Sequence, residues 1–200
     1  MKLFLNKTSP YARMTRIVVL EKGLEKRVAL YWCDPWNDDE QLLAENPVGR
    51  IPVLITDQGT ALSESLLIAG YLNEQQPTPS LVPEDRKEQV LHRVGLGQGL
   101  MDASFTTVIS RKHLDAQANG SVLSQRRSRA IDRTLEQLDR CINRYSSDID
   151  ITLGDISVAV ALEYLAFRLP ETAVADRYPN LEAWRNAITQ RTSFMTTPFS

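Results

Sequence analysis

The stretch Ser9-Pro10-Tyr11-Ala12 stands between a short apolar run and an amphipathic one, and it decides how the first part of the chain folds. Residues 2–5 have the apolar character of a buried strand, and the apolar residues after the stretch recur with helical spacing. Ser is a preferred N-cap and Pro a preferred first helical residue, so the stretch predicts a helix start on two counts. A hydroxyl there lies beside free backbone N–H groups, where an anion is stabilised. Taken alone, however, most such helix starts are only caps.

The residues on either side of this helix start predict a strand–helix–strand unit. The helix is expected from about Pro10 to Lys22 with Gly23 as its stop, and residues 27–32 predict a second strand. Such a unit usually joins two parallel strands by a right-handed crossover. Residues 33–46 predict an irregular stretch with one short helix at 40–45, and their acidic side chains indicate a solvated face.

A stretch with two prolines and one glycine, residues 46–52, leads into a predicted antiparallel hairpin at 53–62. Proline is tolerated at the first residue of a strand, and the Ile51-Pro52 bond can be cis or trans, which the sequence leaves open. Ser65 then predicts the start of a helix that ends near Gln75. This start gives a second positive helix end with hydroxyl and amide donors.

Three prolines in residues 77–83 exclude a continuous helix there and predict a linker between residues 1–76 and 84–200. Beyond it, helices are expected at 84–112, 122–145, 157–169 and 179–190. Thr152 and Asp155 have the spacing of a capping box. Glycines at 95, 97 and 99 indicate close helix packing or a bend. The tail up to Ser200 is expected to have little to hold it.

Length and composition limit the classes of protein that this chain can represent. The chain has 200 residues, with 42% hydrophobic and 24% charged residues and a formal net charge of −2, which is ordinary for a globular protein and gives no overall basic field for nucleic acid. No apolar run approaches the roughly 20 residues of a membrane span, and the first strand is too short for the core of a signal peptide. We therefore expect a cytoplasmic protein that binds neither nucleic acid nor membrane.

The residues that most often bind metals are few and scattered. Cys33 and Cys141 are far apart and lack metal-like spacing, which fits a reducing compartment better than a disulfide framework. His92 and His113 have no evident partner and are expected on the surface. The sequence therefore predicts no metal site.

Four motifs in order carry a resemblance that covers essentially the whole chain. They are Ser9-Pro10-Tyr11-Ala12-Arg13, residues 46–54 (Asn-Pro-Val-Gly-Arg-Ile-Pro-Val-Leu), Glu64-Ser65, and Thr152-Leu153-Gly154-Asp155. Together they resemble the glutathione S-transferase superfamily, and most closely its bacterial members with a Ser-Pro-Phe/Tyr motif, the YibF-like ones included. The resemblance implies an α/β thioredoxin-like N-terminal domain plus an all-α C-terminal domain.

The resemblance also implies a glutathione site. Ser9 falls at the catalytic serine or cysteine of the family, whose hydroxyl hydrogen-bonds the glutathione thiolate when the residue is serine. Ile51 would offer its backbone to the cysteinyl part, and Glu64 and Ser65 would hold the γ-glutamyl end. Arg50 lies where several classes place a basic residue near the glycine carboxylate. Four of these residues also have a purely structural interpretation. Arg50 can be a surface charge, Ser65 a helix cap, Glu64 a charge that complements the helix dipole and Ile51 a core residue.

For the second substrate, a hydrophobic electrophile, the wall is expected to come from both domains. The candidates are Tyr11, Met101, Asp102, Phe105 and Tyr164. Aromatic and Met residues at helical spacing are also typical of a core, so this assignment is open.

Three functions remain open on the sequence. The first is a glutathione transferase that activates the thiol of glutathione, its co-substrate, for attack on an electrophile, with detoxification as the role. The second is a glutathione-dependent redox or lyase enzyme, although redox chemistry in the family uses a cysteine where this chain has Ser9. The third is a non-catalytic binding or assembly module of the same fold. The resemblance also implies a homodimer, with the long helix at 84–112 as the partner surface.

Overall fold

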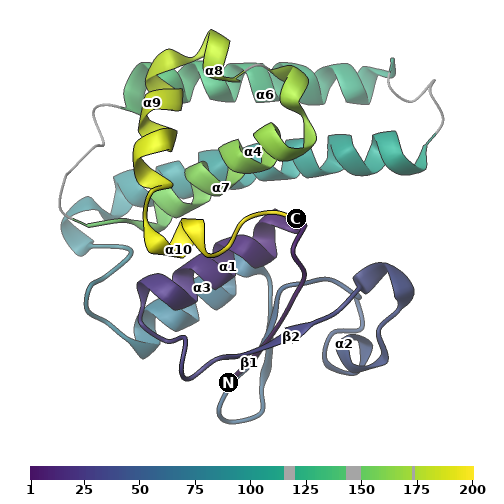
Figure 1. Ribbon diagram of the computed structural model, residues 1–200, viewed down its shortest axis with the longest axis vertical. Helices are drawn as coiled ribbons and strands as arrows, with labels where there is room; N and C mark the ends of the chain where they lie inside the picture. Colours follow the sequence, from purple (N-terminus) through teal and green to yellow (C-terminus); the bar gives the residue numbers. More distant parts are fainter. Residues whose placement is uncertain (115–119, 143–149, 173) are drawn as a thin grey trace. The chain divides into compact units, whose positions relative to one another are not determined.

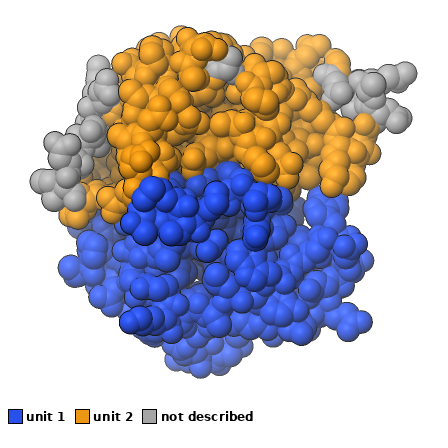
Figure 2. All heavy atoms as spheres, viewed as in Figure 1, with its two compact units in different colours: residues 1–85, 192–200 blue, residues 86–191 orange. Residues whose placement is uncertain are grey.

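The computed structural model describes residues 1–114, 120–142, 150–172 and 174–200. Residues 1–85 together with 192–200 form one unit, and residues 86–191 form a second (Figure 2). The predicted linker at 77–83 lies within the first unit, and the last nine residues belong to that unit rather than to the helical one.

The first unit is built on a four-stranded sheet in the order β2-β1-β3-β4. Its strands are β1 (Lys2–Leu5), β2 (Ala29–Trp32), β3 (Val53–Ile55) and β4 (Ala61–Ser63). β1 runs parallel to β2, while β3 is antiparallel to both β1 and β4. The parallel pair and the hairpin predicted from the sequence are therefore present, although the second strand begins at residue 29 instead of 27.

Both faces of this sheet are covered by helices. α1 (Pro10–Glu21) packs against α3 (Ser65–Gln75), and the two lie side by side in Figure 1. On the other face, Leu42 of α2 (Glu40–Glu45) joins Phe4 and Val53 in a buried cluster that Tyr31 also contacts. Because side chains alternate along a strand, Leu3 and Leu5 point to the face opposite Phe4, and both are buried. A short 3₁₀ turn, η1 (Pro35–Asn37), precedes α2.

The second unit is helical throughout its described part. Its longer elements are α4 (Lys87–His113), α6 (Val122–Cys141), α7 (Leu153–Arg168) and α9 (Pro179–Ile188). Shorter turns are η4 (Pro170–Thr172) and α8 (Val174–Arg177), and η2 (Glu84–Arg86) precedes α4 across the boundary between the units. The helix expected at 122–145 extends at least to Cys141, and residues 143–149 lie outside the described residues. The thioredoxin-like and all-α architecture predicted from the sequence is confirmed.

α4 and α7 pack closely against each other, and a glycine permits the approach. A Cβ added to Gly97 would lie 2.6 Å from the backbone carbonyl carbon of Ser157 and 2.7 Å from the amide of Val158. Gly95 and Gly99 have open space where a Cβ would be, so only Gly97 of these three serves close packing.

The capping box predicted at residues 152–155 is present and is the true start of α7. Thr152 caps the amide of Asp155, and the Asp155 carboxylate accepts from the backbone N–H of Thr152 at 2.8 Å. We expected the helix to begin at Ser157, and this was wrong: it begins at Leu153, directly after the cap. Arg93 of α4, buried, forms an ion pair with Asp155 and donates to the Thr152 hydroxyl at 3.2 Å.

The expectation that little holds the C-terminal tail was also wrong. The tail contains a short helix, α10 (Thr192–Met195), that contacts α1. Ser193 donates a hydrogen bond to Glu21 at 2.5 Å, and the guanidinium of Arg13 lies 4.4 Å from the centroid of the Phe199 ring. These contacts join segments from opposite ends of the chain, so no local sequence pattern predicts them.

Among the residues that the structure describes, no helix is both long and apolar enough to cross a bilayer.

Candidate functional site

The sheet topology brings four of the predicted site residues to one end of the first unit. Ser9 follows the carboxyl end of β1, and Ile51 precedes the amino end of the antiparallel β3. Glu64 follows the carboxyl end of β4, which pairs Ser63 with Val53. Ser65 comes next, at the start of α3. The three strand ends therefore meet at the same edge, together with the N-termini of α1 and α3.

Ser9 is the N-cap of α1, and its hydroxyl accepts a hydrogen bond but donates none within the described residues. It has extended backbone angles, and its Oγ accepts a hydrogen bond from the amide of Ala12 at 3.2 Å. The residue is 8% exposed, and within the described residues its hydroxyl proton has no acceptor. A hydroxyl held in this way can donate to an anion placed at the helix N-terminus.

Asn6, which the sequence analysis did not single out, fixes the backbone of Ser9. Its Oδ1 accepts from the amide of Ser9 at 2.8 Å, from the amide of Thr8 at 3.1 Å and from the hydroxyl of Thr8 at 3.4 Å. This is an Asx turn, in which a side-chain oxygen bonds backbone N–H groups two or three residues on. An Asn three residues before a predicted N-cap was the available signal.

The loop before β3 is organised by another asparagine. The Asn46 side chain donates to the carbonyl of Arg50 at 2.9 Å and accepts from the amide of Val48 at 3.2 Å. The Ile51-Pro52 bond, left open by the sequence, is cis. Ile51 is half-buried, and Arg50 is exposed and forms no ion pair with any described residue.

At the start of α3, the backbone is in an unusual conformation. Glu64 has φ of 69° and ψ of 118°, which costs a non-glycine residue on the order of 1–3 kcal/mol. Its carbonyl nevertheless accepts the first helical bond, from the amide of Ile68 at 3.0 Å. Ser65 is 3% exposed, and among the described residues its hydroxyl makes no hydrogen bond. The backbone at Glu64 and Ser65 is thus fixed by the helix start, while the Glu64 side chain is exposed and the Ser65 hydroxyl stays available to a ligand.

The thiol of Cys33, at the same end of the sheet, is unreactive at neutral pH. Cys33 follows β2 at the same end of the sheet, but burial, together with the negative charge of Asp39, raises the pKa of its thiol to about 11. A thiol with that pKa is almost entirely protonated at neutral pH. In the described part of the chain, no group of three or more His, Cys, Asp or Glu side chains could hold a metal ion.

The candidates for the second-substrate wall have different surroundings in their own units. Tyr11 is half-buried in the first unit. In the second unit, Asp102 is exposed and accepts a hydrogen bond from Gln98 at 3.1 Å, and Phe105 is half-buried. Met101 is fully buried, and burial also raises the pKa of Tyr164 to about 12. These last two side chains therefore offer almost no surface to a ligand. His92 and His113 are exposed.

Comparisons with known proteins agree with this architecture. Residues 8–75 match the family model described as "Glutathione S-transferase, N-terminal domain", and residues 122–187 match "Glutathione S-transferase, C-terminal domain". YibF of Escherichia coli K12, named an uncharacterized GST-like protein, is 32% identical over 171 residues, which cover 84% of this chain and 83% of YibF.

Two crystal structures from Pseudomonas fluorescens Pf-5, both of a glutathione transferase family member, are also similar. One holds glutathione and matches with a TM-score of 0.92 at 33% identity, covering 100% of this chain and 98% of that one. The other holds S-(propanoic acid)-glutathione and matches with a TM-score of 0.87 at 33% identity, covering 99% of each chain.

Proposed function

Because the chain belongs to the glutathione S-transferase superfamily, we propose that it is a glutathione transferase in which Ser9 activates the thiol of glutathione. The activated thiolate attacks an electrophilic carbon of a small, hydrophobic second substrate. The observation that carries this proposal is the unused proton of the buried Ser9 hydroxyl, at the N-terminus of α1.

The activation required is modest. A thiol has a reference pKa of about 8.5, and lowering it by two units takes about 2.7 kcal/mol of preference for the thiolate. A hydrogen bond to a charged group contributes roughly 1.5–3 kcal/mol, and a helix N-terminus roughly 0.3–1 kcal/mol. One hydroxyl and one helix end are therefore sufficient. Positioning of the two reactants supplies much of the remaining rate enhancement.

The rest of glutathione fits the same edge of the sheet. The unpaired hydroxyl of Ser65 and the carboxylate of Glu64 would hold the γ-glutamyl end, and the backbone of Ile51 would pair with the cysteinyl unit. Arg50, exposed and without a described ion-pair partner, would meet the glycine carboxylate. Glutathione bound to one similar structure and a glutathione derivative bound to the other support the tripeptide as the ligand.

Tyr11, the wall candidate of the first unit, is half-buried and would contact the second substrate, while Asp102 and Phe105 of the second unit stay candidates. The S-(propanoic acid)-glutathione bound to one similar structure is a thioether of glutathione, which supports carbon–sulfur bond formation as the reaction type. We further propose a homodimer that buries the exposed Leu91 of α4. A detoxifying role in the cytoplasm stays a prediction.

The decisive experiment separates the hydroxyl of Ser9 from its capping role. In Ser9→Gly the cap is largely kept, at a cost of a few tenths of a kcal/mol, whereas Ser9→Ala loses both functions. We expect both variants to lose about 10- to 100-fold in kcat/KM with 1-chloro-2,4-dinitrobenzene, and the pKa of bound glutathione to rise by about one to two units.

The matched control is Ser121→Ala, which removes the serine cap of α6. The Oγ of Ser121 accepts a hydrogen bond from the amide of Ser124 at 3.2 Å. It is expected to lower stability by about 1 kcal/mol and to leave the thiol pKa unchanged. Equal rates for wild type and Ser9→Gly would remove Ser9 from this role. Calorimetric binding of glutathione without conjugation would favour the non-catalytic module, and disulfide reductase activity would favour the redox enzyme.

A further inference from the structure

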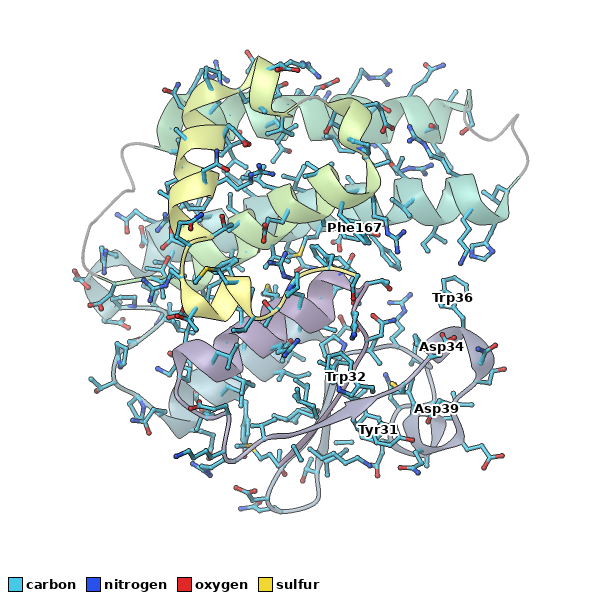
Figure 3. All side chains as sticks on the ribbon, in the orientation of Figure 1. Tyr31, Trp32, Asp34, Trp36, Asp39 and Phe167 are labelled. Atoms are coloured by element: carbon cyan, nitrogen blue, oxygen red, sulfur yellow. The ribbon has the colours of Figure 1, made fainter. Side chains whose placement is uncertain are left out.

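Trp32 is a half-exposed indole at the same end of the sheet as Ser9. Trp32, labelled in Figure 3, is the last residue of β2, and it pairs with Leu5, the last residue of β1. Tyr31 beside it packs into the cluster under α2, so alternation along the strand turns Trp32 to the face that α1 covers. The indole is 44% exposed, which is unusual for so large an apolar side chain.

Two cations lie close to this indole. The ammonium of Lys7 lies 5.9 Å from the ring centroid, and the guanidinium carbon of Arg16 lies 5.4 Å from it. Neither cation pairs with a carboxylate of the described residues. Lys7 is exposed, while Arg16 is half-buried, and burial lowers the pKa of its guanidinium without an opposing acid. A half-buried charge with no partner is costly, and a bound anion would offset that cost.

Lys7 and Trp32 lie on the side of Ser9 away from the other residues proposed for glutathione, and Arg16 lies against Trp32. The strand order is β2-β1-β3-β4, and apart from Ser9, which follows β1, the residues proposed for glutathione precede β3 or follow β4. Lys7 and Trp32 lie on the opposite flank, next to β1 and β2. Lys7 precedes Ser9 by two residues, so their Cα atoms are within about 7 Å of each other.

We propose that Lys7, Arg16 and Trp32 form an acceptor subsite that selects planar aromatic electrophiles bearing a carboxylate. The indole offers a flat apolar surface to an aromatic ring. A guanidinium that lies against an indole keeps its N–H edge for a carboxylate, and Lys7 adds a second, mobile charge. The inference rests on the proposed function, because it names the second substrate of the same reaction.

A matched pair of probes tests the charge alone: 4-chloro-3,5-dinitrobenzoate and 4-chloro-3,5-dinitrobenzamide. In each, the thiolate sulfur forms a bond to the ring carbon that carries chlorine, and chloride leaves with the bonding electron pair, while the thiol proton passes to solvent. We expect wild type to prefer the benzoate about tenfold in kcat/KM, relative to the uncatalysed rates. Arg16→Gln should lose that preference and keep its rate with the benzamide within about twofold.

Two further variants define the subsite. Arg16→Lys keeps the charge but loses the planar fork, so an intermediate preference is expected. Lys26→Gln removes an exposed lysine of the first unit outside the cluster, and it should behave as wild type. An equal loss with both probes in Arg16→Gln, or no preference in wild type, would overturn the proposal.

A carboxylate of glutathione is the other possible partner of these cations. If Arg16→Gln raises KM for glutathione but not for γ-glutamylcysteine, which lacks the glycine, the cations serve the tripeptide and the proposal is wrong. Equilibrium binding of the unreactive 3,5-dinitrobenzoate and 3,5-dinitrobenzamide, followed by tryptophan fluorescence, keeps the test independent of catalysis. Wild type should bind the acid about tenfold more tightly than the amide, and Arg16→Gln should bind both alike. Failure to conjugate either chloro compound would count against the proposed function, while this binding comparison would still decide the subsite.

Discussion

Two helices of this chain, α1 and α7, begin on a capping hydroxyl, and the two hydroxyls have different surroundings. At α7, Thr152 is 1% exposed, accepts from the amide of Asp155 and from Arg93, and donates to the Asp155 carboxylate at 2.6 Å. At α1, Ser9 accepts from Ala12 and among the described residues donates to nothing. All hydrogen bonds of the Thr152 hydroxyl are made inside the protein, and we call this residue the closed cap. The Ser9 hydroxyl keeps one hydrogen bond for a ligand, and we call this residue the open cap.

This difference shows how a structural cap can be distinguished from a functional one. The residue type and the helix position are alike in the two places, so neither separates them. What separates them is the completeness of the hydrogen bonding, since a buried donor without an acceptor costs free energy unless it serves another purpose. Substitutions at the closed cap should therefore lower the stability of the protein, whereas substitutions at the open cap should change how it stabilises an anion.

The largest effect is expected at the closed cap. Asp155→Ala leaves the buried guanidinium of Arg93 without its ion-pair partner and opens the capping box, so the free energy of unfolding should fall by about 3–5 kcal/mol. Urea unfolding of the whole chain measures it, and Asp155→Asn gives a milder variant if the first does not fold. The control is Asp132→Ala, which breaks an exposed pair with Arg177 and should cost at most about 1 kcal/mol. Similar losses for the two sites would refute the distinction.

The next effect concerns the affinity of the open cap for an anion. In Ser9→Cys a thiol occupies a helix N-terminus, where cysteine pKa values fall. It should react with iodoacetamide at neutral pH at least about tenfold faster than Cys33, whose pKa is about 11. The rate should rise with pH through a midpoint below about 8.5, because only the thiolate reacts. Peptide mass spectrometry distinguishes the sites, and a midpoint at or above 8.5 would mean that this helix end does not stabilise an anion.

The smallest effect is expected at the residue that supports the open cap. Asn6→Ala removes the acceptor of the Ser9 amide, and kcat/KM should fall about three- to tenfold, with the fall in kcat. Asn6→Asp keeps that oxygen, so it should restore the geometry while its negative charge raises the pKa of bound glutathione. Asn37→Ala, which removes an exposed side chain that bonds Asp34, serves as the control. A uniform loss in Asn6→Ala and Asn6→Asp, without a change in the pH profile, would argue against a positioning role.

The sequence predicted the elements whose signals are local. The Ser9-Pro10 start, the hairpin at 53–62 and the capping box at 152–155 each depend on residues close together, and all three are present. The start of α7 was predicted too late, at Ser157 instead of Leu153, because residues of the capping box themselves form the first helical turn. The four motifs were also enough to identify the superfamily.

Other features depend on contacts that no local pattern encodes. The tail was expected to be loose, but it is held by α1 through residues separated by most of the chain. Asn6 was overlooked since its role needs the path of the backbone after β1. Met101 has the spacing of a pocket residue as well as that of a core residue, and only the packing of α4 separates the two.

The return of residues 192–200 to the first unit has a consequence for how the protein is made. On the ribosome, the first 85 residues emerge long before the segment that completes their packing beside α1. At roughly 5–20 residues per second, synthesis of residues 86–191 takes about 5 to 20 seconds. The nascent first unit must therefore keep its α1 surface open while the helical unit is synthesised, and a stalled or truncated chain would expose the buried Arg13 and its neighbours to the quality-control machinery.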